Sequence, residues 1–454
     1  MKGKKKLSKI LVANRGEIAI RILRACKELG IRTVAVYSEA DKNSLHLEFA
    51  DEAVCIGKTS PQESYLNISS IISAAEITDS DGIHPGYGFL AENPYFAEVC
   101  ESCGITFIGP TSKNIRLMGD KVKARELMRR VNIPLIPGSK EVVKSKEDAI
   151  ALANKLGYPI MLKARAGGGG KGMRICHSDV RLVSALMTAQ SEAESAFGNS
   201  EIYIERFLEK PRHIEMQIAA DQYGKVIHFG ERDCSIQRRH QKLIEEAPSP
   251  VVDARLRKKI GDLVIKAVKS IKYRSVGTVE FLLVNNNFYF IEMNTRIQVE
   301  HPVTEEITGV DLLKLQILIA AGERIKLKQE DVSCDGAAIE CRINAEDPDN
   351  KFIPSPGNVE FCYFPGGKDV RVETHLYSGY TIPPYYDSLI AKIITKGDTR
   401  AEALQKMDTS LSQTLIDPIK TTVSFCRRVI HHPDFQRGFY HTGFLDQFFR
   451  KEEE

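Results

Sequence analysis

Two carboxylates and an amide fall close together in the second half of the chain. Two segments rich in β-branched and aromatic residues, 278–284 and 288–294, are separated by three asparagines. If these asparagines form a hairpin turn, Glu280 lies directly opposite Glu292, and Asn294 lies on the same face. Opposed carboxylates repel unless a cation lies between them or a proton is shared. Such oxygens suit Mg²⁺ or Mn²⁺, and the alternative is a solvent-facing pair on an edge hairpin.

The residues that follow the hairpin alternate between polar and apolar types. Asn294, Arg296, Gln298 and Glu300 share one face of the chain if it stays extended. An arginine can hold a carboxylate or bicarbonate through two hydrogen bonds, and a glutamate can act as a base. This face beside a metal and a nucleotide therefore suits the binding of a small oxyanion.

A run of four glycines connects two predicted strands, residues 159–164 and 173–176, and consists of Gly167, Gly168, Gly169 and Gly170. Backbone N–H groups in such a loop can close around a phosphate, and Lys163 and Lys171 stand at its two ends. Lys171 is followed by glycine and not by serine or threonine, so the loop is not a Walker A motif. It also does not follow the first strand as a dinucleotide-binding fingerprint would. The alternative interpretation is a flexible linker.

Two further charged segments have simple alternative explanations. Residues 232–242 are densely basic, which is also typical of a solvated surface loop or an RNA-binding patch. No aromatic residue is interleaved with them, and this argues against nucleic acid. In residues 340–348, Arg342 taken alone would most often form a structural ion pair.

Strands and helices alternate in the first part of the chain. Residues 9–13 form a predicted buried strand, 18–29 an amphipathic helix and 33–37 the next strand. Such alternation predicts a parallel sheet that is covered on both faces. After Leu208 the strands become sequential and alternating, as in 213–219, which predicts an antiparallel sheet packed by helices such as 254–271.

We therefore expect an α/β and α+β protein of several domains. The expected boundaries give an N-terminal doubly wound α/β domain, a segment of linker helices with the glycine loop, an antiparallel catalytic domain and a C-terminal domain, at residues 1–120, 121–208, 209–335 and 336–454.

The bulk composition excludes several classes of protein. The 454 residues are 43% hydrophobic and 27% charged, with a net charge of +3, so neither nucleic acid nor an acidic membrane is expected as the main partner. No run of about 18 apolar residues occurs, so no membrane-spanning helix is expected, and the N-terminal residues are not expected to be a signal peptide. The ten cysteines include a single CxxC pair, Cys100 and Cys103, which predicts reduced thiols in a cytoplasmic protein.

Taken together, the motifs resemble those of the biotin carboxylase family, which belongs to the ATP-grasp superfamily. The resemblance extends from about Lys9 to the C-terminus and is carried, with the glycine loop, by residues 12–19, 84–90, 118–121, 231–235, 292–301 and 340–346. It implies an ATP-grasp fold with a mobile lid that carries the glycine loop.

The resemblance also implies a role for each matching residue. ATP would be bound by Lys121, Lys163, the four glycines, Glu205, Leu208, His213, Gln237, His240, Glu280, Leu282 and Glu292. The metal ligands would be Glu280, Glu292 and Asn294. Bicarbonate would be bound by Lys242, Arg296, Gln298, Val299 and Glu300. Biotin would contact Tyr87, Gly88, Gln298 and Arg342. The catalytic groups would be Glu300 as the base, Arg342 as the group that stabilises the biotin enolate, Arg296 and Lys242.

The implied reaction is the carboxylation of biotin with ATP and bicarbonate through carboxyphosphate, as the first half-reaction of acetyl-CoA carboxylase. It would use Mg²⁺ or Mn²⁺, with two ions per site. The chain has no biotinylation motif of the Ala-Met-Lys-Met type, so the biotin carboxyl carrier protein would be separate, together with carboxyltransferase subunits. A homodimer is also implied.

Three other interpretations are weighed against this one. The chain could serve a pyruvate carboxylase or another acyl-CoA carboxylase with the same site. It could be another ATP-grasp ligase, such as a carbamoyl-phosphate or purine-pathway enzyme, although residues 296–301 argue against that. A nucleotide-binding regulator would lack the base or a metal ligand, and neither is missing in the sequence.

Overall fold

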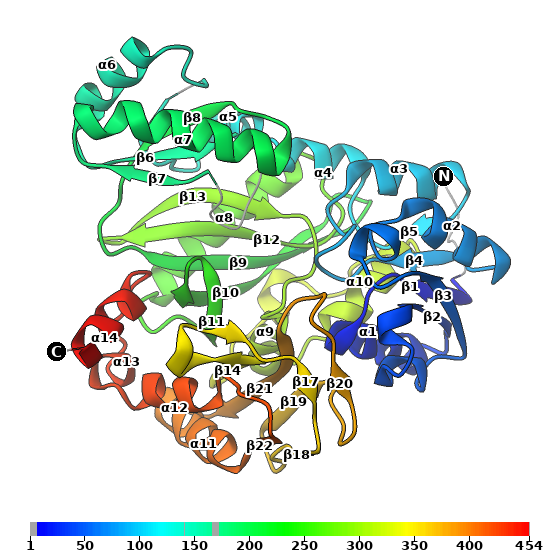
Figure 1. The fold of residues 1–454 in the computed structure, drawn as a ribbon. Helices are drawn as coiled ribbons and strands as arrows, with labels where there is room; N and C mark the ends of the chain where they lie inside the picture. The colour runs from blue at the N-terminus through cyan, green and yellow to red at the C-terminus, as the bar shows by residue number, and fades with distance from the viewer. Residues whose placement is uncertain (1–6, 140, 166–171, 454) are drawn as a thin grey trace.

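The computed structural model describes residues 7–139, 141–165 and 172–453. These residues build three main sheets, which lie in three parts of the molecule (Figure 1). The N-terminal part, drawn in blue, lies to the right of the view. The lid, which runs from α6 to β8 (residues 146–206), lies at the top, and the orange and red C-terminal helices lie at the bottom.

The N-terminal sheet has five strands in the order β3-β2-β1-β4-β5, all parallel. The strands are β1 (Lys9–Val12), β2 (Arg32–Ser38), β3 (Glu52–Gly57), β4 (Gly82–His84) and β5 (Thr106–Phe107), with helices α1 (Gly16–Glu28), α2 (Ile68–Ile77) and α3 (Pro94–Ser102). Every residue of β1 is buried, as expected for a strand covered on both faces. Asn67 and Asn93 cap α2 and α3 through their side-chain oxygens. The predicted doubly wound domain is confirmed.

Two helices, α4 (Ser112–Gly119) and α5 (Lys121–Arg130), lead from this sheet toward the lid. The lid is an antiparallel sheet in the order β7-β6-β8. It contains α6 (Lys146–Leu156), β6 (Ile160–Ala164), β7 (Arg174–Cys176), α7 (Asp179–Phe197) and β8 (Ile202–Arg206). Apolar residues of α6 and α7 pack on β6 and β8. The glycine loop joins β6 to β7 as predicted, but Gly167, Gly168, Gly169 and Gly170 lie outside the described residues.

The largest sheet has eight antiparallel strands in the order β13-β12-β9-β10-β11-β14-β21-β19. Its strands are β9 (Arg212–Ala220), β10 (Val226–Arg238), β11 (Gln241–Ala247), β12 (Ser275–Val284), β13 (Asn287–Asn294), β14 (Ala337–Asn344), β19 (Val370–Thr374) and β21 (Leu389–Gly397). Helix α8 (Ala254–Ser270) packs on it. The C-terminal strands continue this sheet because β14 pairs with β11. The sequence did not predict that continuity.

The hairpin of β12 and β13 differs from the prediction in its turn. The turn has two residues, Asn285 and Asn286, with φ of 47° and 62°, and asparagine tolerates this left-handed region well. A bulge then shifts the register between Glu280 and Phe281. The bulge restores the predicted pairing, so Glu280 lies opposite Glu292 as expected.

The basic residues 232–242 are divided between a buried strand and an exposed turn. They form the end of β10 and the start of β11, and Arg232, Cys234 and Ser235 are at most 1% exposed. Arg239, His240 and Gln241, around the turn between the two strands, are in contrast exposed. The surface-loop interpretation therefore holds only for this turn, and the buried residues 232–237 are not accessible to RNA.

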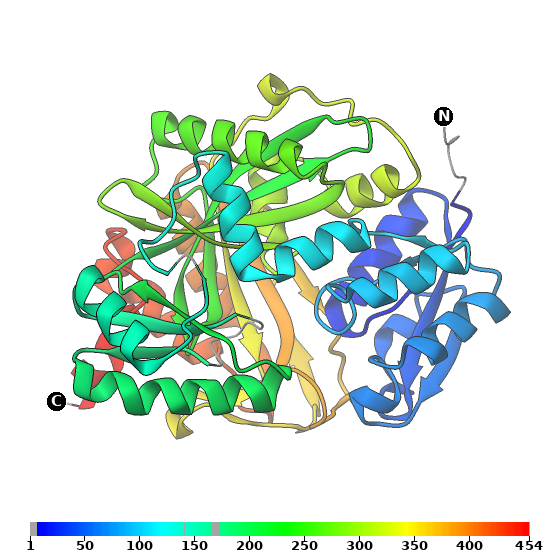
Figure 2. The ribbon, with the colours of Figure 1, turned by 90° about the horizontal axis from the view of Figure 1, so that it is seen from above.

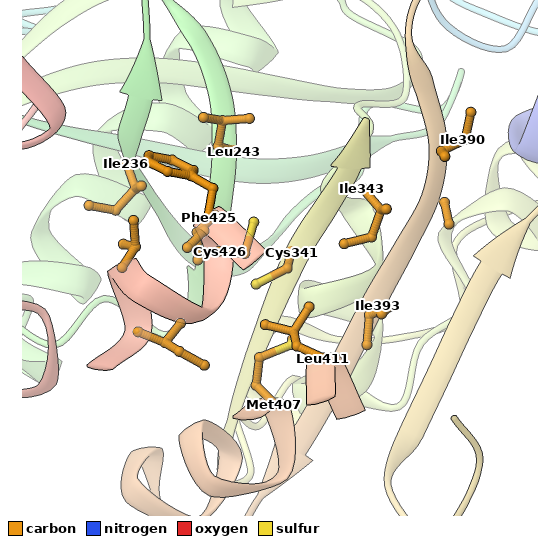
Figure 3. Close-up of a cluster of buried hydrophobic side chains, with 14 of the residues drawn as sticks. Ile236, Leu243, Cys341, Ile343, Ile390, Ile393, Met407, Leu411, Phe425 and Cys426 are labelled. Carbon is orange, nitrogen blue, oxygen red and sulfur yellow. The ribbon is translucent and has the colours of Figure 1, made fainter. Parts of the chain in front are cut away.

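The C-terminal helices cover the far end of the central sheet. Helices α11 (Arg400–Gln413), α12 (Val423–His431), α13 (Pro433–Gln436) and α14 (Phe444–Glu453) lie there. Figure 3 shows Cys341 and Ile343 of β14 packed near Met407, Leu411 and Phe425 from these helices. Side chains alternate along a strand, so Arg342 points to the opposite face, toward the cavity described below.

The remaining short elements connect these parts. They are α9 (His301–Thr308), α10 (Leu312–Ala320) and the two-stranded pairs of β15 (Glu346–Asp347) with β16 (Ile353–Pro354), β17 (Gly357–Asn358) with β20 (Thr381–Ile382), and β18 (Phe361–Tyr363) with β22 (Leu415–Asp417). Across the described part of the chain, no helix is both long and apolar enough to cross a membrane.

Candidate active site

A cavity of about 1240 Å³ opens between the lid, the central sheet and the C-terminal helices. Most of the predicted site residues line it, although they come from distant parts of the sequence. They are Lys121, Lys163, Glu205, Leu208, His213, Gln237, His240, Lys242, Glu280, Leu282, Glu292, Asn294, Arg296, Gln298, Val299, Glu300 and Arg342. In Figure 2 the lid lies beside the central sheet, seen from above.

Three carboxylates form a row across neighbouring strands. Glu215 of β9 pairs with Glu280 of β12, which in turn pairs with Glu292 of β13. Residues in register on neighbouring strands point to the same face, so the row faces the cavity. This concentration of negative charge requires cations nearby.

The ammonium group of Lys242 lies among three carboxylates. Its Nζ is 2.6 Å from Glu215 Oε2, 3.0 Å from Glu280 Oε1 and 2.5 Å from Glu300 Oε1. Burial lowers the pKa of Lys242, but these carboxylates outweigh burial and raise it well above its ordinary value. Lys242 is therefore a fixed positive charge in the floor of the cavity.

Glu300 also contacts Arg342, which reaches across from β14. The Arg342 Nη2 donates to Glu300 Oε2 at 2.9 Å, and its Nε donates to Glu245 Oε1 at 2.6 Å. Burial would raise the pKa of Glu300, but Lys242, Arg342 and Arg232 lower it far below its ordinary value. Glu300 is thus an ionised carboxylate that can accept a proton once an anion draws these cations away.

The alternating polar residues converge as the sequence predicted. The amides of Asn294 and Gln298 both donate to Glu280 Oε1, each at 2.8 Å. Arg296 donates from Nη2 to Asn294 Oδ1 at 3.1 Å and from Nε to Glu92 Oε2 at 2.9 Å. β13 ends at Asn294, but the next residues keep these side chains on the cavity side.

Two lysines border the opposite wall of the cavity. Lys163 of β6 lies 2.6 Å from Glu205 Oε2 of β8, and the other oxygen of Glu205 binds Arg125. Lys121 Nζ lies 3.6 Å from Glu292 Oε2. The two ammonium groups therefore flank the space between the lid and the carboxylate row.

Tyr87 and Gly88 do not line the cavity. The Tyr87 hydroxyl donates to Glu17, and Gly88 is exposed. Tyr87 is nevertheless linked to the cavity wall, because Lys392 Nζ lies 3.1 Å from Glu17 Oε1 and donates to Val299 O at 2.8 Å.

Sequence reasoning missed several residues of the site. They are Glu215, Arg232, Glu245 and Lys392, all buried and in contact with predicted residues. One signal could have revealed Glu215, since polar residues alternate with apolar ones along residues 213–218. The others depend on pairing between strands that are distant in the sequence.

The donor set suits a divalent cation. Glu280, Glu292 and Asn294 present hard oxygen atoms to the same cavity, which are the ligands that Mg²⁺ and Mn²⁺ prefer. One ligand atom each from His213, Glu215 and Glu280 also lies within 4.8 Å of the others. The residues therefore fit such an ion.

Three family profiles match the chain. They describe the biotin carboxylase N-terminal domain at residues 6–115, the carbamoyl-phosphate synthase L chain ATP-binding domain at 120–328 and the biotin carboxylase C-terminal domain at 340–447.

Curated relatives match over almost the whole length. Biotin carboxylase 1 of Bacillus subtilis is 53% identical, over 97% of this chain and 99% of that protein. One of the pyruvate carboxylase subunits of Methanothermobacter thermautotrophicus is also 53% identical, over 98% and 90% respectively.

Solved structures also match the chain over almost its whole length. A biotin carboxylase complex with β,γ-ATP from Campylobacter jejuni has a TM-score of 0.95 at 48% identity, over 97% of this chain and 99% of that one. The biotin carboxylase domain dimer of Hydrogenobacter thermophilus 2-oxoglutarate carboxylase, in complex with MgADP, ADP and bicarbonate, has a TM-score of 0.95 at 51% identity, over 98% of each chain.

Proposed function

This chain belongs to the biotin carboxylase family of ATP-dependent ligases, and from that premise we propose how its own residues divide the reaction. The enzyme carboxylates biotin with ATP and bicarbonate through carboxyphosphate. The single observation that carries the assignment of roles is the contact of Glu300 with both Lys242 and Arg342 inside the cavity.

Bicarbonate binds beside Glu300 in this proposal. Lys242 and Arg296 supply the positive charge, and Gln298 and Val299 supply polar contacts along the same wall. An anion that shares Lys242 weakens the hold of that ammonium on Glu300. Glu300 then accepts the bicarbonate proton, and the resulting oxyanion attacks the γ-phosphate of ATP, which gives carboxyphosphate and releases ADP.

ATP lies between the lid and the carboxylate row. Lys121 and Lys163 hold its phosphates, and the family resemblance adds the backbone N–H groups of the four glycines as further phosphate ligands. Leu208, Leu282, His213, Gln237 and His240 line the part of the cavity that suits the adenine, with Glu205 at its border. Glu280, Glu292 and Asn294 hold the divalent ions, whose positive charge, when they are bound, offsets the charge of the triphosphate.

Biotin approaches from the side of Tyr87 and Gly88, next to Gln298 and Arg342. The guanidinium of Arg342 is permanently charged, and its Glu245 and Glu300 partners hold it at the cavity wall. A charge held in this way stabilises the negative oxygen of the biotin enolate as the phosphate released from carboxyphosphate takes the N1 proton. The enolate then captures CO₂ released from carboxyphosphate.

The proposal extends to the acyl acceptor and the partners of the whole carboxylase complex. We propose acetyl-CoA, with a separate biotin carboxyl carrier protein and carboxyltransferase subunits, a homodimeric enzyme and a cytoplasmic location. A pyruvate carboxylase is the second candidate, since a relative of that name matches at the same 53% identity. Activity reconstituted with each carrier and carboxyltransferase pair would separate the two.

The test follows phosphate release from ATP with Mg²⁺ and bicarbonate, with and without free biotin. We expect biotin to stimulate the wild-type rate, and Glu300→Gln to lower the stimulated rate by at least about 100-fold, because the amide cannot take the proton. The matched control is Glu360→Gln, since Glu360 is exposed. A rate of ATP cleavage that is the same with and without biotin, or full activity in Glu300→Gln, would contradict the proposal.

A further inference from the structure

Arg232 lies directly beneath the floor of the cavity. It belongs to β10 and is among the largest fully buried side chains of the described residues, with an exposure of 0%. Its guanidinium donates five hydrogen bonds, from Nε to Glu215 Oε1 at 2.5 Å, from Nη1 to Gln217 Oε1 at 2.7 Å and Thr304 Oγ1 at 2.9 Å, and from Nη2 to Gln298 Oε1 at 2.9 Å and Thr278 Oγ1 at 3.1 Å.

These bonds settle which way the Gln298 amide faces. Its Oε1 accepts from Arg232, so its Nε2 must point the other way, where it donates to Glu280 at 2.8 Å. Arg232 can only donate. A reversed amide would set the Gln298 NH₂ group against the guanidinium, which costs the free energy of a buried donor without an acceptor.

Arg232 fixes Glu215 in the same way. One oxygen of Glu215 accepts from Arg232 Nε, and the other accepts from Lys242 at 2.6 Å. With its first oxygen held, Glu215 holds the ammonium of Lys242 in place. Arg232 thus contacts Gln298 directly and reaches Lys242 through Glu215, and it does not itself line the cavity.

We propose that Arg232 is a positioning residue for bicarbonate, which sets the Gln298 amide and, through Glu215, the Lys242 ammonium. This inference rests on the proposed bicarbonate site. Lysine cannot replace arginine here, because an ammonium has three donors on a flexible stem and cannot reach acceptors spread around a planar fork.

The first test compares Arg232→Lys with wild type in steady-state kinetics. We expect the KM for bicarbonate to rise about tenfold or more, with the KM for ATP changed less than about threefold, because only the oxyanion side loses its alignment. The matched control is Arg257→Lys. Arg257 forms a bidentate ion pair with Glu231, away from the cavity. Loss of this bidentate pair in Arg257→Lys should leave the KM for bicarbonate unchanged.

A second variant covers the case in which Arg232→Lys does not fold. Thr304→Val keeps the shape of the side chain and removes one acceptor of the guanidinium, and we expect a selective rise of about threefold in the KM for bicarbonate. Equal rises in the KM for ATP and bicarbonate, or a fall in kcat alone, in the folded variant would overturn the positioning role. Wild-type enzyme without bicarbonate- and biotin-dependent turnover would instead overturn the proposed function.

Discussion

Two buried carboxylates beside the floor of the cavity, Glu245 and Glu340, have raised pKa values. Glu245 of β11 pairs in register with Glu340 of β14, and both are buried. Burial raises the pKa of Glu245 to about 7, although Arg342 lowers it. Burial likewise raises the pKa of Glu340 well above its ordinary value. The charge on Glu245 therefore changes near neutral pH.

This raised pKa predicts a dependence of stability on pH. Glu245 binds its proton more tightly in the folded protein than in the unfolded chain, so its contribution to the free energy of unfolding falls as pH rises from 4.5 to about 7. The loss amounts to at most about 3 kcal/mol. Glu245→Gln should not show it. Denaturant midpoints of both proteins from pH 4.5 to 8 give the difference, and a difference that stays constant with pH would refute this assignment.

At the scale of elements, local sequence patterns predicted those features that depend on residues close together in the chain. The buried first strand and the pairing of Glu280 with Glu292 follow from an apolar run and a hairpin. The turn was predicted one residue too long, and the bulge that compensates for it has no sequence signal. The contact of Arg342 with Glu245 depends on pairing between β11 and β14, about 100 residues apart in the chain, so only the resemblance pointed to the role of Arg342.

The attachment of the lid offers a prediction at this scale. Gly138 runs beside β8, where it forms a bridge with Glu205. A Cβ at Gly138 would collide with the backbone oxygen of Ile204 and lie 3.0 Å from the Glu205 Cα. We expect Gly138→Ala to displace β8, lower stability by about 1–3 kcal/mol and raise the KM for ATP several-fold, because Glu205 holds Lys163.

Gly119→Ala is the matched control for that variant. A Cβ at Gly119 meets no atom within 4 Å, so thermal midpoint and KM for ATP should stay close to wild type. The displacement of β8 would be excluded if Gly138→Ala behaved like this control in both measurements.

At the scale of the whole molecule, one buried lysine joins three parts of the chain. Lys392 of β21 contacts Glu17 of α1 and the carbonyl of Val299, and Glu17 accepts from Tyr87. The N-terminal domain is thereby tied to the wall where bicarbonate is proposed to bind. Both Lys392 and Glu17 are almost completely buried, so neither can lose the other without leaving a charge in a medium of low dielectric constant.

A double-mutant cycle measures this link. Lys392→Met leaves Glu17 without its ammonium partner and should lower the free energy of unfolding by about 3–5 kcal/mol. The control is Lys396→Met on the same strand. Its partner Asp335 is 86% exposed, so this change should cost less than about 1 kcal/mol. Adding Glu17→Gln to Lys392→Met removes the stranded charge, so the double variant should be more stable than the sum of the two single effects predicts, by about 1–3 kcal/mol. The KM for free biotin should rise in Lys392→Met, since Tyr87 shares Glu17 as its partner. Strictly additive midpoints with an unchanged KM for biotin would mean that the N-terminal domain is positioned by its apolar contacts with the central sheet, and not by this buried ion pair.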